Sequence, residues 1–135
     1  FIMPKEMTPD DYRNMIRAKA NEVVSHSGGK AEFIEADLFT VDPSKFNNVT
    51  VYYYDAEHTA GATEKGILHF VPSLARTSTL IVDDWNTAGV AEGTFSAIEK
   101  SGLRVVSTHA RVSNVQEDIV GWWNGLFVAL LQRED

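Results

Sequence analysis

The chain has 135 residues, a formal net charge of −7 and no cysteine. A chain of this length forms one domain with its own buried core, and the lack of cysteine excludes a disulfide framework and a thiolate zinc site. The negative charge argues against nucleic acid or an anionic membrane surface as a partner.

The first expected element is a helix that begins after Thr8 and ends before Gly28-Gly29. Thr8 has the spacing of a capping box with Asp11, and Pro9 suits the first helical position. Apolar side chains recur on one face at the helical period, at Tyr12, Met15, Ile16, Ala20, Val23 and Val24. A strand is expected next, over 31–39.

Two apolar runs that end in acidic residues dominate the middle of the chain. The first, over 49–55, and the second, over 79–83, have the composition of buried parallel strands. In open α/β sheets, ligands bind just outside the C-terminal ends of such strands. The candidate site residues delivered there are Asp55, His58, Asp83 and Asp84.

Helices are expected over 59–74, which Pro72 weakens near its end, and over 90–100. Their predicted core side chains are Ile67, Leu68, Val71, Leu74, Phe95 and Ile98. Strands over 103–108 and 121–132 follow each other without a helix between them, which predicts an antiparallel hairpin. The fold class is therefore α/β: one domain over 1–135, about three helices, and a mostly parallel sheet of about five strands with a C-terminal antiparallel hairpin.

Two motifs resemble those of a known enzyme family. The segments YYYDAEHT (52–59) and LIVDDWN (80–86) are similar to the fourth- and fifth-strand motifs of class I S-adenosylmethionine-dependent methyltransferases, closest to the macrocin and catechol O-methyltransferases. The resemblance covers nearly the whole chain. It implies a partial Rossmann-like sheet holding strands three to seven of the family order 3-2-1-4-5-7-6, with the last strand inserted antiparallel.

The resemblance also implies an activity, which is methyl transfer from S-adenosylmethionine to a hydroxyl of a small molecule. It places a divalent cation such as Mg²⁺ on Asp55, Asp83 and Asp84, hard oxygen ligands suited to that ion. The cation would orient the acceptor hydroxyl and lower its pKa. Asp37 and Asp55 would contact the cofactor.

Each of these residues has a structural alternative. Asp83 or Asp84 can cap the following helix, and Asp55 can sit in a turn. His58 can act as a general base, since it titrates near neutrality, or bond to the backbone where a helix starts. Asp37 can be a solvated strand-end acid. Trp122 and Trp123 are adjacent, so a strand would direct one to the core and the other to an interface.

One family feature is missing from these 135 residues, because no G-x-G-x-x-G turn follows a strand. We therefore expect an N-terminally truncated domain without the Gly-rich cofactor loop. Its unpaired fourth strand would take strand three or another chain as its neighbour, which predicts a homo-oligomer. The alternatives to the enzyme are a non-catalytic, self-associating fold and a protein that uses Mg²⁺ for phosphoryl chemistry.

The remaining expectations concern location. No apolar run reaches the roughly 20 residues that cross a bilayer, and the sequence has no secretory signal. We therefore expect a cytoplasmic protein with no membrane partner.

Overall fold

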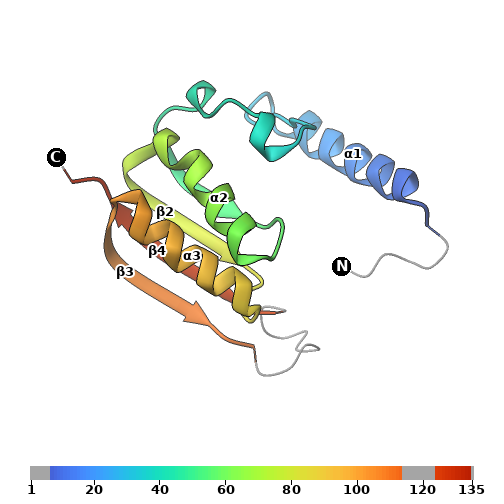
Figure 1. Ribbon diagram of the computed structural model, residues 1–135. Helices are drawn as coiled ribbons and strands as arrows, with labels where there is room; N and C mark the ends of the chain where they lie inside the picture. Colours follow the sequence, from blue (N-terminus) through green and yellow to red (C-terminus); the bar gives the residue numbers. More distant parts are fainter. Residues whose placement is uncertain (1–6, 114–123, 135) are drawn as a thin grey trace. The chain divides into compact units, whose positions relative to one another are not determined.

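The computed structural model of the protein describes residues 7–113 and 124–134, which fall into two compact units (Figure 1). The first unit ends at Asp37 and holds the helix α1 (Pro9–His26), and the second begins at Leu38 and holds the sheet. Within the described ranges, no helix combines the length and the apolarity needed to cross a bilayer.

The helix α1 begins as its sequence predicts. The Thr8 side chain accepts a hydrogen bond from the Asp11 backbone at 3.2 Å, and the Asp11 carboxylate accepts one from the Thr8 backbone at 3.1 Å. Hydrogen bonds from the Thr8 hydroxyl and backbone hold the pKa of Asp11 below its ordinary value. The apolar stripe stays accessible, because no residue of α1 is buried.

The segment 31–39, predicted as a strand, is not one. It pairs with no described strand, and Leu38–Thr40 forms the short 3₁₀ helix η1. Instead, Arg17 of α1 binds the Glu35 carboxylate through two hydrogen bonds of 2.6 Å. The backbone N–H and C=O groups of a strand need hydrogen-bond partners on a neighbouring strand. The alternating residues of this segment do not show whether such a neighbour is present.

The predicted mostly parallel sheet of five strands is also wrong. Over residues 7–113 and 124–134, the sheet has four strands in the order β1-β2-β4-β3, and β1 and β2 are its one parallel pair. The last strand, β4, lies between β2 and β3 and runs antiparallel to both, which makes the sheet mixed. The antiparallel pairing of the last two strands is as predicted. The bounds are β1 Val49–Tyr54, β2 Leu74–Asp83, β3 Arg104–Arg111 and β4 Leu126–Gln132.

Two helices cover one face of this sheet (Figure 1). They are α2 (Ala60–Phe70), which continues into the 3₁₀ helix η3 (Val71–Ser73), and α3 (Ala88–Ser101). A further 3₁₀ helix, η2 (Pro43–Lys45), precedes β1. The core lies between the helices and the sheet, because alternate strand residues are buried there, namely Leu80, Val82, Phe127, Ala129 and Leu131.

The two helices approach each other at backbone distance. A Cβ at Gly93 would lie 2.4 Å from the Ala60 carbonyl oxygen, and a Cβ at Gly89 would lie 2.6 Å from that of His58. Only glycine fits at either point. This close approach fixes the chain from His58 to Ala60, where α2 begins, against the first half of α3.

One predicted core residue is misplaced. Phe95 is 56% exposed, whereas its neighbour Thr94 is fully buried and faces the core. The small residues of α3 face α2 because the helices are so close, and the large Phe95 ring is left outside. It still makes edge contacts with the rings of Trp85 and Phe127, at centroid distances of 5.4 and 5.9 Å.

Candidate functional site

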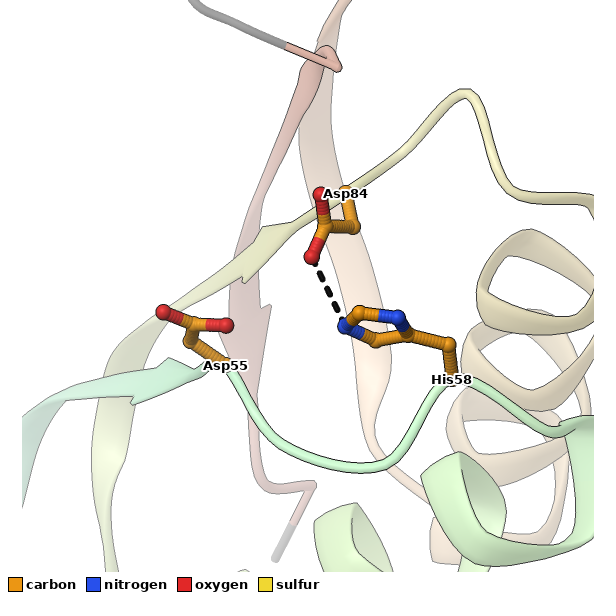
Figure 2. A group of neighbouring side chains, drawn as sticks. All are labelled: Asp55, His58 and Asp84. Atoms are coloured by element: carbon orange, nitrogen blue, oxygen red, sulfur yellow. Dashed lines mark ion pairs between the residues drawn. The ribbon is translucent and has the colours of Figure 1, made fainter. Parts of the chain in front are cut away.

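The C-terminal ends of β1 and β2 meet at one edge of the sheet. The strands are parallel and in register to their ends, with Tyr54 opposite Val82. Asp55 follows β1, and Asp83 ends β2 with Asp84 directly after it. Asp55 and Asp84, which the sequence places at two different strand ends, are therefore neighbours in space (Figure 2).

Asp84 is the most buried of these acids. Its backbone is in the left-handed region, with φ 53°, and its side chain is only 12% exposed. The Asn124 amide donates to its Oδ1 at 2.6 Å, and the Asn86 backbone donates to the Asn124 carbonyl at 2.9 Å. The turn after β2 is thus attached to the residues that lead into β4.

Asn124 is a site residue that the sequence reasoning missed. It too has a left-handed backbone, with φ 63°, and Gly125 follows with φ 84°. A Cβ at Gly125 would lie 2.7 Å from the Asn86 side-chain oxygen, so the close packing of this turn requires glycine. The Asn-Gly pair is a turn signal in the sequence and is the feature that could have found it.

His58 lies against Asp84. Its Nε2 is 2.7 Å from Asp84 Oδ2, and about half of its side chain is exposed. Thr59 caps α2 by accepting a hydrogen bond from the Ala62 backbone, so His58 directly precedes the cap. Figure 2 shows the His58 ring directed toward the strand ends, where one ligand atom from each of Asp55, His58 and Asp84 lies within 4.8 Å of the others.

Asp55 is exposed, and its surroundings disfavour the ionised form of its carboxyl group. Partial burial raises the pKa of its carboxyl group above the ordinary value, the negative charges of Asp83 and Asp84 add to this rise, and His58 opposes it. A positive ion at this point would relieve the repulsion between the carboxylates.

Asp83 stands apart from the group of three. Its Oδ2 accepts a hydrogen bond from the Tyr53 hydroxyl at 2.6 Å, and its Oδ1 accepts one from the Asp84 backbone at 2.9 Å. Burial, followed by the bond to Asp83, raises the pKa of Tyr53. The structure therefore brings His58 to Asp55 and Asp84 while Asp83 binds protein donors.

The other predicted site residues lie elsewhere. Asp37 is exposed at the end of the first unit, and its contact with a cofactor stays a prediction. Trp85 belongs to the core, where its ring stacks on Phe127 at a centroid distance of 4.2 Å. Trp122 and Trp123 lie outside the described residues.

No protein-family model, curated protein or solved structure matches this chain.

The group of three offers the types of ligand atom that divalent cations bind. It offers one imidazole nitrogen and two carboxylate oxygens, and such atoms lie roughly 3 Å apart when they share one ion with bonds near 2 Å. The observed limit of 4.8 Å is somewhat wider. Because Asp55 is exposed and His58 half-exposed, small rotations of these side chains would close the difference, with Asp84 as the fixed ligand.

S-adenosylmethionine does not fit the residues of this chain in the same way. In the family that the two motifs resemble, a Gly-rich turn and an acid at the end of a neighbouring strand hold its carboxylate and ribose. The 135 residues contain no G-x-G-x-x-G turn.

Proposed function

We propose that this chain carries the cation- and acceptor-binding part of an S-adenosylmethionine-dependent O-methyltransferase that acts on a small hydroxylated molecule. The observation that carries the proposal is the convergence of Asp55, His58 and Asp84 at the C-terminal ends of two parallel strands. This is the place where α/β sheets bind ligands.

The strand order gives additional support. The resemblance implies the order 4-5-7-6 for this part of the sheet, with the last strand antiparallel, and the observed order β1-β2-β4-β3 has the same arrangement. Many α/β proteins end strands in aspartate, so the acids alone do not distinguish this family from others. The inserted antiparallel strand is a second, independent feature that supports the proposal.

Each residue of the group would have a distinct role. Asp84, which the Asn124 amide fixes, would hold the cation in place. Asp55 would supply a second negative charge that the cation neutralises. His58 would exchange its contact with Asp84 Oδ2 for a bond to the ion through Nε2. A divalent cation in such a site lowers the pKa of a bound hydroxyl. If Nε2 of His58 binds the ion, it is not available to accept a proton from the substrate. The role of His58 as a general base is therefore the alternative.

Calorimetric titration of the chain with Mn²⁺ and Mg²⁺ tests the cation site. We expect binding to the unaltered chain and a loss of roughly tenfold or more in affinity, about 1.4 kcal/mol, for Asp55→Asn. Asp10→Asn is the matched control, because it makes the same charge change on an exposed residue of α1. Equal affinities for all three proteins would contradict the site.

Titration with S-adenosylmethionine and transfer of its labelled methyl group to a catechol test the enzyme itself. Methyl transfer that requires the cation would support the proposed enzyme even though the 135 residues lack a G-x-G-x-x-G turn. Cation binding with neither cofactor binding nor methyl transfer would support the alternative, a non-catalytic fold that keeps an inherited cation site.

A further inference from the structure

The two edge strands of the sheet differ in charge. In the part of the chain that the structure describes, β1 and β3 each pair with a single neighbouring strand. The outer strand β3 carries Arg104, His109 and Arg111, and charged side chains are a common protection of sheet edges. The strand β1 reads VTVYYY and carries no charge. Only β1 therefore has the composition of an unprotected edge.

The exposed side chains of β1 are uncharged, namely Thr50, Val51 and Tyr53. Tyr52 and Tyr54 face the helices, where the Tyr52 hydroxyl donates to the Gly66 carbonyl at 3.0 Å and Tyr54 is 4% exposed. Val51 and Tyr53 alternate with them and so face the other side of the sheet, at 55% and 45% exposed. Half of the backbone N–H and C=O groups of an edge strand also point away from its one neighbour.

We propose that β1 pairs with β1 of a second copy of this chain, antiparallel and about a two-fold axis, to join two sheets into one. A two-fold axis normal to the sheet keeps equivalent faces together, so the helices of both copies lie on one side. With the axis at Tyr52, Val51 of each copy lies opposite Tyr53 of the other. Pairs of aromatic and β-branched residues are favourable across neighbouring strands.

The sequence of β1 is what selects a second copy as the partner. Paired with itself about Tyr52, it places Val51 opposite Tyr53 and Thr50 opposite Tyr54, each a β-branched residue opposite an aromatic one, and it presents no charge that would favour a charged partner strand. The pairing also brings no like charges of the strands together, although the chain has a net charge of −7. Because the described residues of each chain form one such edge, the pairing closes at a dimer and does not propagate.

Light scattering coupled to size exclusion, on the full chain at submillimolar concentration, tests this proposal. We expect a dimer for the unaltered chain and a monomer for Val51→Lys, with the same far-ultraviolet dichroism. Val106→Lys is the matched control, because Val106 is 45% exposed on the other edge strand, and it should remain a dimer. A monomeric unaltered chain, or a Val51→Lys variant that is still dimeric, would overturn the proposal.

A cross-linking experiment locates the interface without relying on a loss of association. The chain has no cysteine, so Val51→Cys introduces a unique thiol. A short bismaleimide should join two copies of this variant and leave the Val106→Cys variant uncoupled. Coupling through Val106→Cys without coupling through Val51→Cys would place the contact elsewhere and contradict pairing through β1.

Discussion

The two strand ends of the candidate site are built differently. The residue after β2, Asp84, is largely buried, has a left-handed backbone and is held by the Asn124 amide. The residues after β1, Asp55 and His58, are exposed or half-exposed and belong to the short connection to α2. One strand end therefore offers a fixed ligand, and the other offers adjustable ones, as suits a site that must close around an ion.

The largest effect is expected where the connection after β1 is held in place. A side chain at Gly93 would collide with the Ala60 backbone, so Gly93→Val should lower the free energy of unfolding by about 2–3 kcal/mol. Urea unfolding measures this. Gly61→Ala is the control, because a Cβ there meets no atom within 4 Å and alanine favours a helix by about 0.8 kcal/mol or more. Equal stability of the two variants would mean that the helices do not fix this connection.

The next effect concerns the fixed ligand. Asn124→Ala should cost about 2 kcal/mol, because it removes a hydrogen bond to a largely buried carboxylate, and it should weaken cation binding as well. Asn48→Ala is the control, because Asn48 has the same left-handed backbone, with φ 60°, just before β1. If both variants lose the same stability, the loss comes from the backbone conformation and not from the bond to Asp84.

The third prediction separates the adjustable ligands by their chemistry. An imidazole nitrogen favours Mn²⁺ and Zn²⁺ over Mg²⁺ more than an oxygen ligand does. His58→Gln should therefore reduce Zn²⁺ affinity by roughly tenfold, about 1.4 kcal/mol, and change Mg²⁺ affinity less. Competition titrations measure the ratio. An unchanged ratio would remove His58 from the ligand set and leave it as a candidate base.

The smallest effect follows from the raised pKa of Asp55. The folded protein binds the Asp55 proton more tightly than the unfolded chain does. The free energy of unfolding therefore falls as the pH rises from about 3.9, the ordinary pKa of an aspartate, through the raised pKa of Asp55. Asp55→Asn should then be more stable than the unaltered chain at neutral pH and equal to it in acid. The gain should stay well under about 1 kcal/mol, because solvent screens an exposed group. Unfolding measured at several pH values would contradict this if the variant gained stability only in acid.

The fixed and the adjustable parts of the site also differ in how far the sequence predicts them. The acids at the ends of β1 and β2, and the cap of α1, follow from local patterns and are found where expected. The choice between Asp83 and Asp84 does not follow. Asp83 continues the alternation of β2 and meets Tyr53, whereas the left-handed turn at Asp84 directs its carboxylate to His58.

The remaining differences are non-local. Whether 31–39 forms a strand depends on a neighbour that is distant in the sequence, and the exposure of Phe95 depends on how closely α2 approaches α3. The role of Asn124 depends on the place of β4 beside β2. No pattern within one segment contains this information, because each feature is set by packing between segments.

The most direct test of the cation site is the paramagnetic effect of Mn²⁺ on the amide resonances of the full chain. If Asp55, His58 and Asp84 hold the ion, the amide signals of residues 55–58 and 84–86 should broaden first, at Mn²⁺ levels far below the protein concentration. Asp55→Asn should clearly weaken this broadening at the same Mn²⁺ level. Signals that broaden first around the exposed acids of α1, or that broaden equally along the chain, would contradict a cation site at the two strand ends.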